Sequence, residues 1–468
     1  MGQLILFEIK KSIKSRKNRI VLVIYLILIA SLIFTKIDQG ASKRAETVKN
    51  LVFLQDYYML DNATYGNRAD LYDSPLFRAY ADNAAVRAEY YGKKAQALLN
   101  RDLQAELEAD IEHYTNELNF YTNTIRGIIE RGELLKGLPT RFLDYPFRLL
   151  NSYDARLNII EYYELQLDFL TSLRDKGIKP MSHYDLTGFA FLYTAFNELL
   201  PPISLLIALL VLSDIVSGES DSGSFKFLLL QPLPRWKVIL AKAASAFIIT
   251  LMWLLIPILV AFLFVGLMNG FGDPAYPVLY LNDTFTSLSA PGAAPNYDST
   301  YLARDFYRFL SWERDTAYAA VEYRHGNFYL GFSKYASENG YFLVFALPNK
   351  ELTLVPIGIF VLRCLIPIIL YAIFAAALAV FVSTLAQKGI ISIVLGTLLG
   401  MLFTIFTIQP EGIDIVTALL PITYKNPVVL LSGLGGSTAL LGMIVLAVCS
   451  ILLLVISGIM FKKRDIIC

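Results

Sequence analysis

Charged residues are scarce in this chain of 468 residues. Asp, Glu, Lys and Arg make up only 17% of it, below the roughly 25% of an ordinary soluble domain. Hydrophobic residues make up 55%, and the mean hydropathy is +0.50. The formal net charge is only +1, so we expect no nucleic-acid partner. These shortages argue against a soluble domain and predict an integral membrane protein.

Cysteine and histidine are equally rare, with three residues of each. Three cysteines are too few for a disulfide framework. The histidines are scattered, and the sequence contains neither a His-Glu-x-x-His nor a Gly-x-Ser-x-Gly motif. It also lacks the Gly-x4-Gly-Lys-Ser/Thr loop that binds nucleotide phosphates. We therefore expect no catalytic residues, no metal and no cofactor on this chain.

Long apolar runs are what the sequence has in abundance. A helix that crosses the hydrocarbon core of a bilayer needs about 20 apolar residues, within a range of roughly 17–25. Six runs meet this requirement, at 20–36, 189–213, 238–268, 355–385, 390–408 and 439–461. The predicted fold is therefore a polytopic α-helical membrane protein with six transmembrane helices.

Lysine and arginine gather in four short segments between or beside these runs. The segments are 1–19, 214–237, the turn that contains Lys388, and the tail 462–468. Short cytoplasmic segments are enriched in these residues, and an even number of spans places all four on one side. We expect a multi-pass protein with both termini in the cytoplasm. The expected location is the cell membrane, and we favour the plasma membrane of a bacterium.

Two long segments then lie outside, at 37–188 and 269–354. In the first, apolar residues recur every three or four positions between Leu103 and Ile128, which predicts an amphipathic helix. The second is rich in Tyr, Asp, Ser, Gly and Pro, which favours turns and short elements. We expect one external domain, mainly helical and partly mixed, with further elements at Leu149–Leu173, Arg304–Tyr323, Phe328–Lys334 and Tyr341–Leu347.

The basic loop 214–237 has the pattern of a short helix. Pro232 and Pro234 end a stretch of helix-compatible residues at Ser224–Gln231. Its apolar residues Phe225, Leu228 and Leu229 have the three-and-four spacing of one helix face. A helix of about two turns is not stable alone, so we expect this one to dock on a cytoplasmic partner. Docking on the protein's own helices is the alternative.

The order of residues in this loop carries a resemblance. It reads Gly218-Glu219, Ser222-Gly223-Ser224, Phe225-Lys226-Phe227-Leu228-Leu229, Pro232-Leu233-Pro234-Arg235 and Ala241-Lys242. This order is similar to the coupling-helix segment of the ABC-2 type permeases, the type V exporter fold. The amphipathic basic segment 1–19 resembles the elbow helix of that family. Segment 409–438 resembles its re-entrant helices between spans five and six.

The resemblance implies a permease subunit with no ATPase activity of its own. Two permeases, identical or different, would enclose a path, and a dimer of cytoplasmic ABC ATPase subunits would supply ATP and Mg²⁺. Its coupling residues would be Glu219, Phe225, Lys226, Phe227, Leu228, Leu229 and Arg235. Export of a peptide, an antibiotic-like amphiphile or a lipid-linked cargo fits the large external domain. The alternative is a membrane sensor or assembly factor whose external domain binds a ligand or partner without transport.

Glu198 in predicted span two and Arg363 in predicted span four carry opposite charges. Glu198 and Arg363 lie toward the outer ends of spans two and four, and intramembrane charges usually face each other or the interior of the bundle. We therefore predict a Glu198–Arg363 ion pair near an outer gate, with placement of both at the headgroup boundary as the alternative. Pro201 and Pro202 are expected to kink span two and to form a moving joint.

Overall fold

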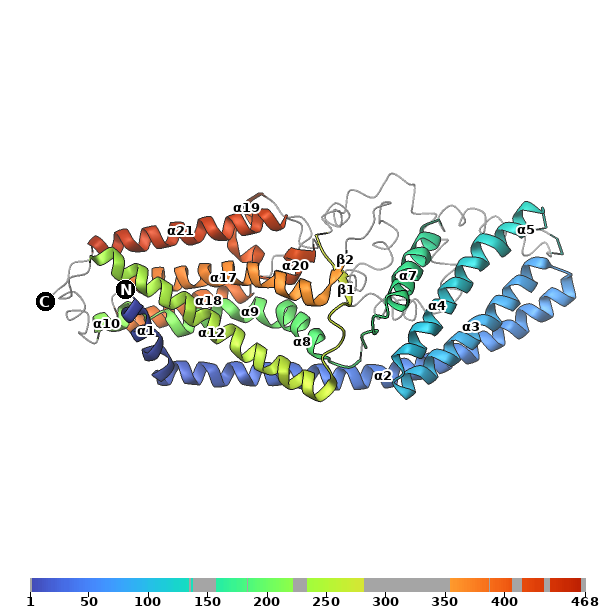
Figure 1. Ribbon diagram of the computed structural model, residues 1–468. Coiled ribbons are helices and arrows are strands. Elements are labelled where there is room, and N and C mark those ends of the chain that lie inside the picture. Colours follow the sequence, from blue (N-terminus) through green and yellow to red (C-terminus); the bar gives the residue numbers. More distant parts are fainter. Residues whose placement is uncertain are drawn as a thin grey trace.

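The protein is seen in a computed structural model as helices gathered at the two ends of an elongated molecule (Figure 1). Helices α9, α12, α17, α18 and α21 lie at one end, and α3, α4, α5 and α7 lie at the other. Helix α2 runs through both groups. The structure describes residues 2–133, 136–137, 157–182, 184–221, 234–281, 354–386, 388–405, 415–432 and 438–463.

Five helical stretches in the described part of the chain are long and apolar enough to cross a membrane. They are the first part of α2 (Arg16–Tyr72), the stretch Gly188–Glu219, α12 (Arg235–Asn269), α17 (Ile357–Leu385) and α21 (Ala439–Lys463). A shorter apolar helix, α18 (Gly389–Ile405), lies in the predicted fifth span. The chain is therefore a polytopic helical membrane protein, while the count of six spans stays a prediction.

The stretch Gly188–Glu219 is not one uniform helix. It consists of α8 (Gly188–Thr194), a π-helical turn η3 (Ala195–Leu199), α9 (Leu200–Leu212) and α10 (Ser217–Asp221). The predicted span 189–213 covers the first three of these elements. The change of helix type falls directly before Pro201 and Pro202.

Helix α2 extends much further than the predicted first span at 20–36. Its 57 residues correspond to about 86 Å at 1.5 Å per residue. The residues that it buries recur on one face, from Val21 and Tyr25 near its start to Tyr58 and Ala69 near its end. The helix ends where Asp73 adopts a left-handed conformation, and Pro75 begins the next helix. One continuous helix therefore serves both the membrane part and the part that is predicted to lie outside, which we name the external part.

The external part is built mainly of helices, as predicted. Helix α3 (Pro75–Asn100) packs along α2, and α4 (Leu103–Asn119) packs on α3 and on α7 (Leu157–Asp175). The helix predicted from Leu103 to Ile128 is present, but a π-helical turn η1 (Phe120–Ile125) and α5 (Arg126–Glu130) complete it. In the helix predicted at Leu149–Leu173, the described residues begin at Leu157.

A buried ion pair joins α3 to α4. The Arg87 guanidinium donates from Nε to Glu117 Oε1 over 2.6 Å and from Nη2 to Glu117 Oε2 over 2.8 Å. Burial works to raise the pKa of Glu117, but Arg87 together with His113 and Asn83 outweighs burial and lowers this pKa. The Arg87 side chain also lies over the ring of Tyr58 on α2. One charged pair thus links three external helices.

Little of the second external segment is described. Strand β1 (Pro277–Leu279) pairs antiparallel with β2 (Leu354–Pro356), which brings the two ends of the segment together. The predicted helix at Arg304–Tyr323 and the strands at Phe328–Lys334 and Tyr341–Leu347 lie outside the described residues.

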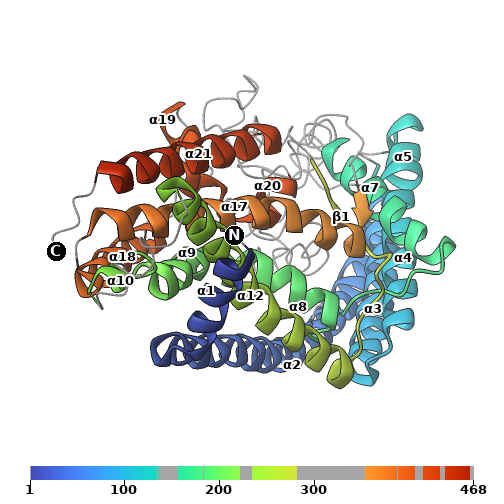
Figure 2. The same cartoon turned by 60° about the vertical axis from the view of Figure 1, so that its left-hand side comes forward.

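Short broken elements occupy the described part of the predicted re-entrant segment 409–438. They are α19 (Ile415–Ala418), a 3-10 turn η5 (Pro421–Tyr424) and α20 (Pro427–Ser432). Helix α20 contacts both α17 and α21, as the turned view shows (Figure 2). Their breaks agree with the predicted pattern, and their re-entrant placement in a membrane stays a prediction.

Candidate functional site

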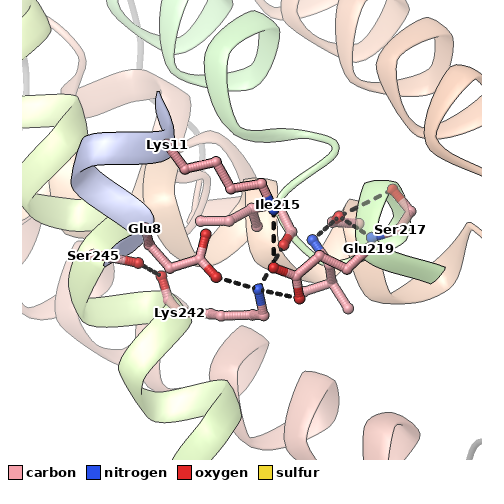
Figure 3. Close-up of polar contacts among 9 residues, drawn as sticks. Glu8, Lys11, Ile215, Ser217, Glu219, Lys242 and Ser245 are labelled. Atoms are coloured by element: carbon pink, nitrogen blue, oxygen red, sulfur yellow. Dashed lines mark hydrogen bonds and ion pairs between the residues drawn. The ribbon is translucent and has the colours of Figure 1, made fainter. Parts of the chain in front are cut away.

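A buried lysine lies near the start of α12. Lys242 is two turns from the first residue of that helix, and its side chain is 0% exposed. Its ammonium group donates to Glu8 Oε1 over 2.6 Å and to the Ile215 carbonyl over 2.9 Å, and it lies 2.8 Å from Glu219 Oε2 (Figure 3). Two of its three protons are thus donated to Glu8 and to the Ile215 carbonyl, and Glu219 forms an ion pair with the same group.

Helix α1 (Gly2–Lys14) brings two of the charges to this place. It packs on α12 and turns Glu8 inward, while Leu6 and Phe7 are exposed. Burial raises the pKa of the Glu8 carboxyl, and repulsion from Glu219 adds to the rise. The positive charge of Lys242 acts in the opposite direction but does not cancel the rise. The sequence predicted an amphipathic elbow at 1–19, and the structure has an amphipathic helix there with one acid on its buried side.

Glu219 on α10 stands between two cations. Lys11 Nζ lies 2.9 Å from its Oε1 atom, and Lys242 lies on its Oε2 atom. Two carboxylates and two ammonium groups therefore form one cluster without net charge, which we name the elbow cluster: Glu8, Lys11, Glu219 and Lys242. A buried charge that loses its partner costs several kcal/mol, so this cluster is stable only when complete.

Neighbouring contacts fix the same end of the bundle. Ser383 Oγ on α17 accepts from the backbone N–H groups of Val216 and Ser217, which begin α10. Lys17 Nζ at the start of α2 lies 2.5 Å from Asp214 Oδ1. Ser383 thus ties α17 to the start of α10, and Lys17 ties α2 to the turn that precedes α10.

Of the seven predicted coupling residues, the structure describes Glu219 and Arg235. Phe225, Lys226, Phe227, Leu228 and Leu229 lie outside the described residues, in segment 222–233. Glu219 lies before that segment and belongs to the elbow cluster. Arg235 lies after it and donates from Nη1 to the Lys462 carbonyl at the end of α21, over 3.2 Å. The two elements that flank segment 222–233 are therefore tied to each other through Glu219 and Lys242.

The predicted pair of Glu198 and Arg363 is not formed in the part of the chain that the structure describes. Glu198 Oε2 lies 2.7 Å from Lys36 Nζ on α2, and the Arg363 guanidinium lies 4.5 Å from the ring centre of Tyr280. Both alternatives are physically sound, because a long lysine reaches a neighbouring helix easily and an aromatic face attracts a guanidinium. The prediction overlooked Lys36, which is the last residue of predicted span one at 20–36.

Pro201 and Pro202 lie where span two was expected to kink. They occupy the first turn of α9, directly after the π-helical turn. Proline is tolerated in a first helical turn because its missing N–H has no intrahelical role there. The change to a π-helical turn falls where the kink was predicted, while the kink and its role as a moving joint stay predictions.

Sequence reasoning missed the part that Glu8, Lys11 and Lys242 play together. A signal for it existed, because Lys242 is the only charged residue in 238–268 and Glu8 is the only acid in 1–19. An isolated ion in an apolar span calls for a partner of opposite charge. Matching the one buried cation to the one acid of the elbow would have indicated the contact.

Comparison with known proteins gives the family. A family described as ABC-2 family transporter protein matches residues 3–466, nearly the whole chain. Comparisons with curated proteins and with solved structures each gave no significant match. The match covers the membrane helices, both external segments and the elbow cluster together. The chain thus belongs to the ABC-2 family of transporter proteins and is a permease.

Proposed function

We propose that this permease forms the transmembrane part of an exporter whose energy comes from a separate cytoplasmic ATPase dimer with its own ATP and Mg²⁺. The observation that supports this most is the elbow cluster, because it ties both flanks of segment 222–233 to α1. A helix in that segment that docked on an ATPase would pull on α10 and α12 together.

The charges of the elbow cluster explain how such a pull would spread. Glu219 cannot move away from Lys242 without leaving buried charges unpaired, which is costly in an apolar setting. Glu8 and Lys11 add α1 to the same unit. A displacement of the predicted coupling helix would therefore enter spans two and three as one movement.

The proposed arrangement places both termini in the cytoplasm and the chain in the plasma membrane. It is supported by the position of α1 and of the end of α21 on the same end of the molecule (Figure 1). A second permease would complete the path. The long external helices favour a peptide, an antibiotic-like amphiphile or a lipid-linked cargo over a small ion.

The coupling role is tested on the full chain expressed with its ABC ATPase. The variant Phe225→Ser/Leu228→Ser/Leu229→Ser is expected to lose co-purification of the ATPase and to abolish the permease-dependent part of its ATP turnover. Its matched control is Phe53→Ser/Leu60→Ser/Leu71→Ser, which changes the same residue types at external positions that are 53%, 67% and 72% exposed. An intact complex with unchanged turnover in the first variant would exclude docking through this segment and would favour the sensor or assembly factor.

A further inference from the structure

The proline pair in span two removes two hydrogen-bond donors. In an α-helix the N–H of residue i bonds the carbonyl of residue i−4, so Pro201 and Pro202 leave the carbonyls of Asn197 and Glu198 without these partners. A bare carbonyl is unfavourable within a membrane, and side chains of neighbouring helices commonly supply the missing donor.

Asn426, the residue before α20, meets this break from a neighbouring element. Its Nδ2 atom donates to the Asn197 carbonyl over 3.0 Å and to Asn197 Oδ1 over 2.9 Å. Its Oδ1 atom accepts from the backbone N–H groups of Val428 and Val429, over 3.0 and 3.1 Å. The same side-chain amide therefore caps the first turn of α20. It also donates to the Asn197 carbonyl, to which Pro201 cannot donate because it has no N–H.

Two further contacts surround the same turn. Lys36 on α2 pairs with Glu198, and Thr404 on α18 donates from Oγ1 to the Pro202 carbonyl over 2.7 Å. The break is thus held from three directions, by α2, α18 and the residue before α20. Asn426 differs from the other two because it bonds the carbonyl that the proline frees.

We propose that Asn426 is a positioning residue that pins the proline break of span two to α20, and that movement of span two about this break requires its two bonds to Asn197 to open. The statement about the pin rests on the contacts alone, and only its place in a transport cycle rests on the proposed function. Each net hydrogen bond biases an equilibrium by about tenfold at most, so two such bonds hold the turn and can still open.

The pin is tested by amide hydrogen exchange of the full chain in lipid nanodiscs, without ATPase or cargo. Asn426→Asp keeps the size of the side chain and the acceptor that caps α20 but removes the donor. We expect the backbone amides of 195–212 to exchange about tenfold faster. The control Asn67→Asp makes the same change on an exposed face of α2 and is expected to leave that region unchanged. Asn426→Ser, which also caps a helix, serves if the first variant does not fold.

Pro201→Ala separates a pin from a general packing role. It restores an N–H that can bond the Asn197 carbonyl, so adding Asn426→Asp to it should accelerate exchange by less than about twofold. Wild-type exchange in Asn426→Asp, or an undiminished acceleration in the double variant, would overturn the proposal. Either result leaves the ATPase experiment unaffected, and loss of the coupling role leaves this one unaffected.

Discussion

Lys242 shows how a buried cation can hold several helices in a fixed arrangement. A buried ion pair stabilises a fold little compared with apolar residues of the same size, but removal of one partner is strongly unfavourable. In the elbow cluster this lysine is shared by Glu8, Glu219 and the Ile215 carbonyl. Such an arrangement contributes a fixed geometry among α1, α10 and α12.

Replacement of this cation should therefore destabilise the protein severely. Lys242→Met leaves Glu8 and Glu219 buried together without it, and we expect a loss of about 3–5 kcal/mol. The measurement is the thermal denaturation midpoint of the full chain in lipid nanodiscs. Lys237→Met, the same change at an exposed position of the same helix, should alter stability by less than about 0.5 kcal/mol. Equal shifts in the two variants would contradict the assigned role of Lys242.

Helix α2 is crossed at close range by another segment of the chain. The linker from Met181 to Thr187 passes over it at Gly40, where any Cβ would overlap the Tyr184 carbonyl. One turn further on, Arg44 pairs with Asp185 and covers the ring of Tyr184. Gly40 therefore permits a close approach that fixes the direction of the external helices relative to the membrane part.

Two glycines of this helix should respond with opposite signs to the same change. Gly40→Ala forces a methyl group against the linker backbone, which typically costs about 1–3 kcal/mol. Gly66→Ala meets nothing within 4 Å and should stabilise the helix by about 0.5–1 kcal/mol. Thermal denaturation and limited proteolysis within 178–187 measure both effects. Stabilisation by Gly40→Ala would show that the linker does not rest on α2 in solution.

Local sequence patterns predicted which helices exist better than they predicted where those helices begin and end. Apolar runs gave the spans, and the spacing from Leu103 to Ile128 gave an external helix, because both signals are local. The continuation of α2 to Tyr72 had no such signal, since residues 37–72 carry mixed polarity on a helix that is buried on one side only. The contact of Glu8 with Lys242 spans 234 positions, so it depends on how the elements pack.

At the scale of the whole molecule, α18 lies along α9 from the turn before α10 to the proline break. Four small residues repeat at every fourth position of α18 and face α9 along its length: Ser392, Gly396, Gly400 and Thr404. Ser392 bonds the Ser213 carbonyl beside α10, and Thr404 bonds Pro202 at the break. Small residues let membrane helices approach closely, so α9 and α18 are expected to move as one body.

A larger residue in this row should separate the two helices. A Cβ at Gly400 would lie 3.0 Å from Leu206 Cδ1 and 3.1 Å from the Leu206 Cα atom, so Gly400→Val pushes against backbone, and overpacking of this kind costs about 1–3 kcal/mol. Gly458→Val in α21, where nothing lies within 4 Å, is the matched control. We expect a lower denaturation midpoint only for Gly400→Val, together with faster amide exchange in α9. Because the close packing of α9 on α18 is what would carry a movement from the elbow cluster to the break, equal behaviour of the two variants would remove the physical basis for that transmission.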